Sequence, residues 1–115
     1  RPATRYEAKP QPGLLATSDW LKDADMPRLD ARSLGEHIGL VGGGKGQRPG
    51  TLPGAHHLPF DWLSDDQSAR LRSTEQLRAL FDYAGLDNQA AVHFCQSGNR
   101  AALTWFVDYA VLGHE

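Results

Sequence analysis

The stretch AVHFCQSGNRAALTWF, residues 91–106, decides the fold. An apolar run over residues 90–94 predicts a β-strand, and apolar positions at helical spacing from about Ala101 predict a helix. The only cysteine of the chain, Cys95, stands where that strand would end. In parallel sheets the active groups gather beyond the carboxyl ends of the strands. The stretch therefore predicts an α/β protein with a candidate site at Cys95.

The whole chain has the size and composition of one globular domain. It has 115 residues, of which 40% are hydrophobic and 23% charged. A net charge of −2 argues against an electrostatic grip on nucleic acid or on an anionic membrane surface. No apolar run approaches the length of a membrane span. A single cysteine excludes an internal disulfide framework.

Strand-like and helix-like segments alternate on both sides of the Cys95 stretch. Short apolar runs predict strands over residues 14–17, 28–31, 55–58 and 90–94. Helix signals follow each of them: Ser18 as a cap, one turn over residues 33–37, a capping box at residues 73–76, and the apolar face from Ala101. Gly85 is the expected stop of the third helix. This alternation predicts a mostly parallel sheet covered by helices.

Glycine and proline dominate residues 39–54, which predicts a long loop. Its residues 39–46 satisfy seven of the eight positions of a phosphate-binding P-loop. The eighth position is Gly46, where serine or threonine should hold magnesium, so we reject that interpretation. His56 with His57, and His93 with Cys95, are weak metal signals. His56 and His57 are neighbours on a strand and face opposite ways, and histidines on strands more often find hydrogen bonds. We expect no metal and no cofactor.

The chemistry of residues 95–100 favours an activated thiol. A loop that leads into a helix N-terminus can direct several backbone N–H groups at one point and stabilise an anion. Gly98 permits a conformation that a side chain would obstruct, and Arg100 adds a positive charge. Such surroundings lower the pKa of a cysteine and favour the nucleophilic thiolate. The alternative is an inert buried thiol, which a bare strand would favour.

Three separated motifs carry a family resemblance. The octapeptide CQSGNRAA, residues 95–102, resembles the active-site loop of the rhodanese family of sulfurtransferases. LDARSLGEH, residues 29–37, is similar to that family's Asp-x-Arg-x-x-x-Glu pattern. RPGTLPGAHHLPF, residues 48–60, is similar to its Gly-His-Ile-Pro-Gly-Ala segment, with Thr51 where histidine is frequent and Leu52 where isoleucine is. The three motifs occur in order over nearly the whole chain.

The resemblance implies a three-layer rhodanese-like fold and a persulfide mechanism. The Cys95 thiolate would take a sulfur atom from thiosulfate or 3-mercaptopyruvate and pass it to cyanide, a thiol or a protein cysteine. It implies substrate contacts from the loop residues Gln96, Ser97, Gly98, Asn99 and Arg100. Arg48, in the glycine-rich loop, is a further candidate for the anionic donor, and a solvated loop arginine is the alternative. Gln96-Ser97-Gly98 matches neither donor class fully.

The second motif is expected to support the site rather than to react. Asp30, at a strand end, is expected to accept hydrogen bonds from N–H groups near the Cys95 loop. Arg32 and Glu36 are expected to pair across one helical turn.

Two other functions remain as alternatives. Phosphatases and arsenate reductases of the same fold have five residues between cysteine and arginine, which leaves room for a tetrahedral oxyanion. Here four residues separate Cys95 from Arg100, which favours sulfur transfer. Non-catalytic modules of the family typically lose the cysteine, and this chain retains it.

The ends of the chain suggest part of a larger assembly. Residues 1–13 are interpreted as an arm or inter-domain linker, and residues 14–115 as a rhodanese-like domain that lacks its last strand. We expect the strand over residues 90–94 to pair with the Asp30 strand on one side, with its other side open or occupied by a partner domain or segment. The composition leaves the compartment open between the cytoplasm and a bacterial periplasm.

Overall fold

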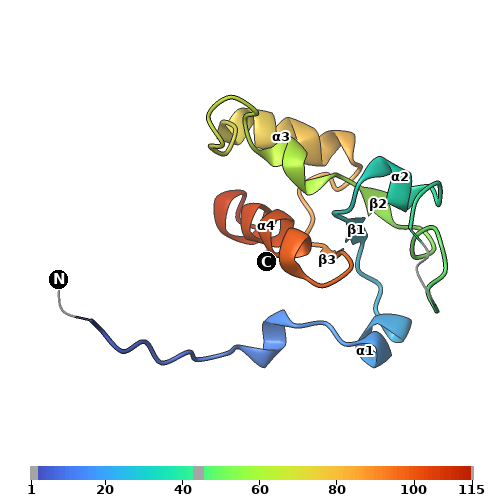
Figure 1. Ribbon diagram of the computed structural model, residues 1–115, viewed down its shortest axis with the longest axis horizontal. Helices are drawn as coiled ribbons and strands as arrows, with labels where there is room; N and C mark the ends of the chain where they lie inside the picture. The colour runs from blue at the N-terminus through green and yellow to red at the C-terminus, as the bar shows by residue number, and fades with distance from the viewer. Residues whose placement is uncertain (1–2, 43–45, 115) are drawn as a thin grey trace.

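A computed structural model describes residues 3–42 and 46–114 of the chain. Three short parallel strands form one sheet in the order β2-β1-β3, where β1 is Arg28–Asp30, β2 is His56–His57 and β3 is Val92–Phe94. Helices α3 (Thr74–Tyr83) and α4 (Asn99–Phe106) lie on one face of the sheet and α2 (Leu34–His37) lies on the other, while α1 (Ser18–Asp23) lies below the sheet in the view of Figure 1. The predicted three-layer α/β fold is confirmed.

The register of the strands explains which side chains meet which layer. Leu29 is level with His56 on one side and with His93 on the other. Because side chains alternate along a strand, these three point to the same face. Their contacts show which face this is, since His56 bonds to the end of α3 and His93 bonds to α4. Asp30 is level with His57 and Phe94 and faces the layer of α2.

The core lies between this face of the sheet and its two helices. It consists of eight buried hydrophobic side chains: Leu29, Leu58, Leu63, Leu77, Phe81, Leu86, Val107 and Leu112. The predicted capping box begins α3, since Ser73 Oγ accepts from Gln76 N–H at 3.2 Å and Gln76 reaches back to Ser73 N–H. Gly85 ends this helix with a φ of 91°, a conformation that a side chain would strain.

The expected edge strand over residues 14–17 is wrong. Pro12–Leu14 forms a 3-10 turn, η1, and Leu15 is 77% exposed with no strand beside it. Pro12 suits the first position of a helical turn. Thr17 rather than Ser18 caps α1, because its Oγ1 accepts from Trp20 N–H at 3.2 Å. A strand needs a neighbour for its backbone groups, and this segment has none within the described residues.

Other boundaries differ from their predictions by one or two residues. Each of the three strands is shorter than its apolar run, and α4 begins at Asn99 rather than at Ala101. After α4 the chain widens into η3 (Val107–Val111), a π-helical turn. A further 3-10 turn, η2 (Phe60–Leu63), follows β2.

Two segments lie outside the layered body. Residues 3–11 form neither helix nor strand and extend away from the domain (Figure 1). In the long loop, residues 39–42 and 46–54 also lack helix and strand, as predicted, and residues 43–45 lie outside the described residues. No helix in the described parts of the chain is long and apolar enough to cross a membrane.

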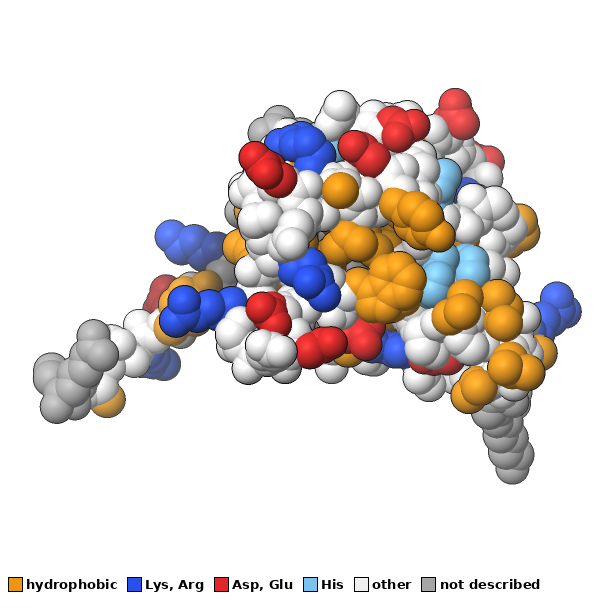
Figure 2. All heavy atoms as spheres, turned by 90° about the horizontal axis from the view of Figure 1, so that it is seen from above, with side chains coloured by type: hydrophobic (Ala, Val, Ile, Leu, Met, Phe, Trp, Pro, Cys, Tyr) orange, Lys and Arg blue, Asp and Glu red, His pale blue; other side chains and the backbone are white. Residues whose placement is uncertain are grey.

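The surface carries several exposed hydrophobic side chains. Those on α2 and the loop after it are Leu34, Ile38, Leu40 and Val41, and Trp62 of η2 is 42% exposed. Figure 2 shows hydrophobic and histidine side chains side by side on one face of the molecule.

Candidate active site

Cys95 follows β3 directly and lies against the first turn of α4. Its Sγ accepts hydrogen bonds from the backbone N–H groups of Gly98, at 3.1 Å, and Ala101, at 3.3 Å. Gly98 is the residue that precedes α4 and has a left-handed φ of 95°. Few residues other than glycine adopt this conformation without strain, so the glycine allows the loop to turn its N–H toward the sulfur.

The surroundings of the thiol favour its charged form. Burial alone raises the pKa of Cys95, because it removes water from the thiolate. The backbone N–H groups of Ala101, Ser97, Gly98 and Arg100 together outweigh that effect. The pKa of Cys95 therefore lies below its ordinary value, which is the condition for a nucleophilic cysteine.

The loop contributes its backbone rather than its side chains to this arrangement. Gln96, Ser97 and Asn99 are exposed, and within the described residues their side chains make no hydrogen bond. They belong to the loop that holds the thiol, and their exposure makes them available to an incoming molecule. Their predicted role in substrate binding stays a prediction.

Arg100 is held by Glu36 of α2. Its Nη1 lies 2.7 Å from Glu36 Oε1 and its Nη2 lies 3.1 Å from Oε2, so the contact is bidentate. The Arg100 hydrogen bonds are the main reason that the pKa of Glu36 falls to about 2. Paired in this way, Arg100 keeps a fixed place beside the loop.

The expected Arg32–Glu36 pair is wrong, and the cap of α2 gives the reason. Ser33 is the N-cap residue of α2, and its Oγ accepts from Glu36 N–H at 3.3 Å while Glu36 Oε1 lies 3.0 Å from the same Oγ. Arg32 therefore lies before the helix and does not share a helical face with Glu36. Each of the two side chains finds a different partner.

Asp30 is the partner of Arg32. This carboxylate is fully buried, and it accepts from Arg32 N–H and Nε at Oδ1 and from Arg32 Nη2 at Oδ2, all at 2.9–3.0 Å. Thr51 Oγ1 donates to Oδ2 at 2.9 Å and His37 Nδ1 lies 3.0 Å from it. The expectation that Asp30 would bind N–H groups of the Cys95 loop is wrong, because its acceptor positions are taken by α2 and the long loop.

Arg32 connects this carboxylate to two neighbours of the candidate site. Its Nη2 also donates to Gly50 O at 2.6 Å, which attaches the long loop to the carboxyl end of the central strand β1. Its guanidinium carbon lies 6.0 Å from the centre of the ring of Phe94, the residue before Cys95. Sequence reasoning did not identify Thr51, His37 or Gly50 as part of this network. The only signal was that Thr51 departs from the family pattern.

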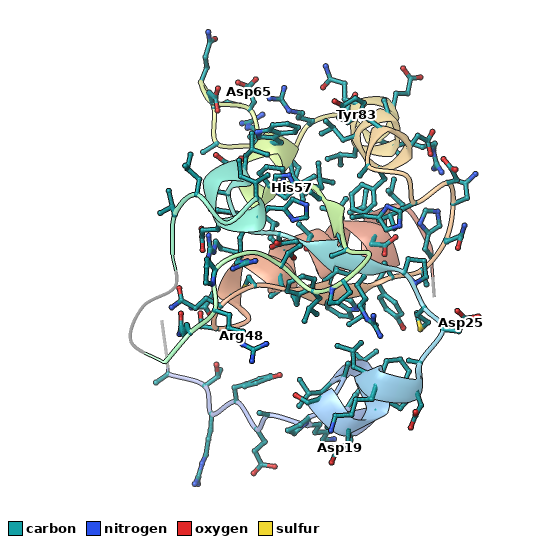
Figure 3. The ribbon with its side chains drawn as sticks, turned by 90° about the vertical axis from the view of Figure 1, so that its right-hand side faces the viewer. Asp19, Asp25, Arg48, His57, Asp65 and Tyr83 are labelled. Carbon is teal, nitrogen blue, oxygen red and sulfur yellow. The ribbon has the colours of Figure 1, made fainter. Side chains whose placement is uncertain are left out.

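Arg48 lies apart from these contacts. It is exposed on the long loop (Figure 3), and no hydrogen bond or ion pair to it occurs among the described residues. Its predicted role in holding an anionic donor stays a prediction. The described parts of the chain contain no group of three or more His, Cys, Asp and Glu side chains that could hold a metal ion.

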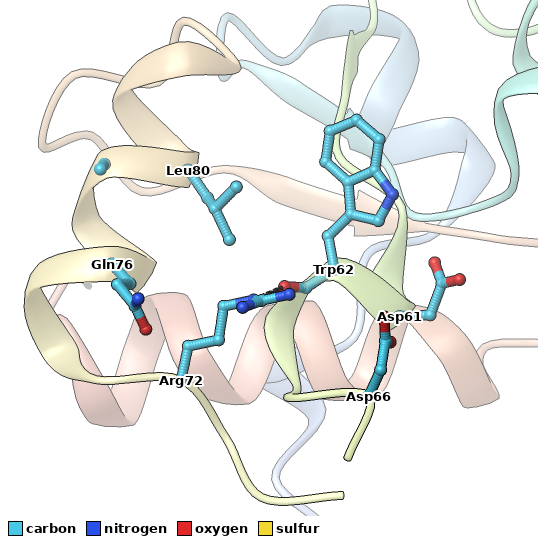
Figure 4. A pocket seen from close by; sticks show the side chains of 7 residues that line it. Asp61, Trp62, Asp66, Arg72, Gln76 and Leu80 are labelled. Atoms are coloured by element: carbon cyan, nitrogen blue, oxygen red, sulfur yellow. Dashed lines mark hydrogen bonds between the residues drawn. The ribbon is translucent and has the colours of Figure 1, made fainter. Parts of the chain in front are cut away.

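A pocket lies between η2 and α3 (Figure 4). Its lining consists of Asp61, Trp62, Asp66, Arg72, Gln76, Ala79 and Leu80. Arg72 Nε donates to Trp62 O at 2.6 Å and closes one side of it. No residue of the Cys95 loop belongs to this lining, so the pocket is separate from the candidate site.

The sequence of the chain is similar to those of several named proteins. A Mycobacterium bovis protein with the provisional name thiosulfate sulfurtransferase 1 is 32% identical over 125 aligned residues, covering 100% of this chain. A Mycolicibacterium smegmatis protein with the same kind of provisional name is 33% identical over the full chain. The Mycobacterium tuberculosis protein SseA, also provisionally a thiosulfate sulfurtransferase, is 41% identical over 66 residues, or 57% of this chain. No family model matches the chain.

The chain is shorter than these relatives. It spans 45% of the length of the M. bovis and M. smegmatis proteins, and the SseA match spans 22% of that protein.

Proposed function

Because this chain belongs to the rhodanese family of sulfurtransferases, we propose that it transfers a sulfane sulfur through a persulfide on Cys95. The observation that carries the proposal is the pair of backbone N–H groups, from Gly98 and Ala101, that donate to Sγ. These donors stabilise a sulfur anion, and the thiolate before transfer and the persulfide after it are both sulfur anions.

The chemistry is a displacement at sulfur in two steps. In the first step the Cys95 thiolate attacks the transferable sulfur of the donor, and a new S–S bond forms. With thiosulfate the old S–S bond breaks and sulfite leaves with its electron pair. With 3-mercaptopyruvate the C–S bond breaks, and pyruvate leaves as its enolate and takes up a proton. In the second step an acceptor nucleophile attacks the outer sulfur of the persulfide, and the Cys95 thiolate leaves. No redox partner is needed, because each bond that forms replaces one that breaks.

The donor is proposed to be a small sulfur-containing anion, thiosulfate or 3-mercaptopyruvate. The relatives carry thiosulfate in their names. The exposed groups of Gln96, Ser97 and Asn99, with the charge of Arg100 behind them, are proposed to contact it. Arg48 is proposed as a further contact from the long loop. Cyanide and small thiols are the proposed acceptors.

The proposal predicts sulfur loading that can be weighed directly. After incubation with thiosulfate or 3-mercaptopyruvate and removal of the excess, intact mass spectrometry is expected to show one added sulfur atom. Subsequent cyanide treatment is expected to return the original mass and release thiocyanate. An unchanged mass with both donors, together with turnover of an aryl phosphate, would instead support the phosphatase alternative.

We also propose that residues 1–13 are an arm and residues 14–115 a domain whose sheet is completed by a partner domain or segment. Val92 N–H donates to Pro27 O at 2.8 Å, and Phe94 O accepts from Ala31 N–H at 3.0 Å. By alternation, the N–H and C=O of His93 face the other edge of β3, where the described residues supply no strand. The relatives extend well beyond the matched region, which supports this proposal.

This proposal predicts that backbone amides on the two edges of β3 are unequally protected from hydrogen exchange. In this chain alone, the His93 amide is expected to exchange with deuterium much faster than the Val92 and Phe94 amides, because only these two face β1. Site-resolved hydrogen exchange measures the difference. Equal protection of all three amides would contradict an open edge.

A further inference from the structure

A buried polar network joins the centre of β3 to α4 and η3. His93 Nδ1 lies 2.9 Å from Thr104 Oγ1, and His93 Nε2 lies 2.8 Å from Asp108 Oδ2. Asp108 Oδ1 lies 2.7 Å from His114 Nδ1, and the backbone O of Asp108 accepts from His114 N–H at 3.0 Å. The side chains of His93 and Asp108 are 1% and 3% exposed, and Thr104 is fully buried. None of these residues touches the reacting sulfur in the proposed mechanism.

The network fixes where α4 lies on the sheet. Buried polar groups destabilise a protein strongly unless they are hydrogen-bonded, so the ring of His93 must meet both of its partners. Thr104 and Asp108 are four residues apart and lie one above the other on the same face of the helical segment. One ring that bonds to both therefore limits sliding of α4 along β3 and rotation about its own axis.

The same helix provides the donors to Cys95. His93 and Cys95 are two residues apart, and both contact α4, His93 through Thr104 and Cys95 through Ala101. A continuous set of hydrogen bonds connects them. Thr104 Oγ1 donates to Ala101 O at 3.1 Å, and Ala101 N–H donates to Cys95 Sγ at 3.3 Å. The residue bonded to His93 is thus bonded in turn to a residue that cradles the sulfur.

We propose that His93 is a positioning residue for the nucleophile: by fixing α4 through Thr104 and Asp108, it holds the N–H groups of Gly98 and Ala101 at hydrogen-bonding distance from Cys95 Sγ. The inference rests on the proposed function only in taking Cys95 as the nucleophile. When His93 loses its two contacts, α4 is free to shift. The donors then move from the sulfur, and the thiolate becomes harder to form.

The test measures the ionisation of Cys95 without any sulfur donor. The chain has one cysteine, so the rate of alkylation by iodoacetamide, followed against pH, reports on Cys95 alone. Arg100 is a charged neighbour of Cys95 and is paired with Glu36, and none of the variants below alters either residue. The midpoint of the rate profile gives the pKa of the thiol.

His93→Phe, which keeps a ring and removes both hydrogen bonds, is expected to raise that midpoint. A rise of one pH unit would reduce the thiolate fraction about tenfold below the midpoint. His93→Gln, which retains an amide able to bond, is expected to give an intermediate midpoint. Thr104→Val removes the link to Ala101 with little change of volume and is expected to raise the midpoint as well.

His56→Gln is the matched control. His56 is also a strand histidine, and its Nδ1 lies 2.7 Å from Ala84 O at the end of α3, on the far side of the sheet order from β3. The alkylation midpoint of the His56→Gln variant is expected to equal that of the parent. If folded His93→Phe also shows the parent midpoint, the proposal is overturned. If His93→Phe fails to fold, a folded Thr104→Val with the parent midpoint overturns the proposal instead.

Failure of the proposed function would look different from failure of this inference. If the parent gains no sulfur from either donor while the His93→Phe and Thr104→Val midpoints rise, the sulfurtransferase proposal fails and the positioning role stands. If the parent gains sulfur and the midpoints do not move, the sulfurtransferase proposal stands and the positioning role of His93 fails.

Discussion

Cys95→Ser is expected to abolish sulfur loading. A serine hydroxyl is similar in size to the thiol, but it is not ionised near neutral pH even beside the N–H groups of Gly98 and Ala101. Without an anion at this position no bond to the donor sulfur forms. The expected loss is at least roughly 10⁴-fold, the scale for removal of a covalent nucleophile. Intact mass after incubation with thiosulfate measures it, with the parent protein in parallel.

The variant must remain folded for this result to count. Cys95 is only partly buried and is not one of the residues of the hydrophobic core. The thermal midpoint of Cys95→Ser is therefore expected to stay close to that of the parent. Circular dichroism monitors this. Sulfur still gained by a folded Cys95→Ser protein would show that another group carries the reaction.

Asp30→Asn is expected to destabilise the domain by about 3 kcal/mol, within the range for removing one partner of a buried ion pair. The carboxylate is fully buried and joins Arg32, His37 and Thr51 at the carboxyl end of the central strand β1. An asparagine keeps the volume, but its NH₂ group turns a donor toward other donors. Urea unfolding at pH 7, compared with the parent, measures the change in the free energy of unfolding.

The pH dependence of the stability difference between the parent and Asp30→Asn tests whether the lost carboxylate charge causes it. Burial raises the pKa of Asp30, but the hydrogen bonds from Arg32, His37 and Thr51 outweigh it and lower the pKa from 3.8 to about 2. Because the folded pKa is depressed, this stabilisation is complete above pH 3.8 and is lost as the pH falls through about 2. The difference between parent and Asp30→Asn is therefore expected to narrow between pH 4 and pH 2. The exposed Asp82→Asn, on α3, is the control and is expected to change stability little at either pH.

The sequence by itself determined the features that depend on neighbouring residues. The capping box at Ser73 and Gln76 formed as predicted, since its two hydrogen bonds join residues three apart. Gly85 ended α3 because a left-handed turn favours glycine. Cys95 was placed correctly after a strand and before a helix, because the change from a strand pattern to a helical pattern occurs at that residue. Parallel pairing of β1 and β3 followed from the alternation of strands and helices.

Only the tertiary structure decided which distant groups meet. Glu36 bonds Arg100 across 64 residues of sequence rather than Arg32 four residues away, because the cap at Ser33 leaves Arg32 outside the helix. The apolar run over residues 14–17 formed no strand, since local pattern cannot supply a partner for its backbone groups. The local sequence gave no signal for the two hydrogen bonds of His93 either. Its partners Thr104 and Asp108 come within reach only when α4 packs on β3, and burial then makes both hydrogen bonds necessary.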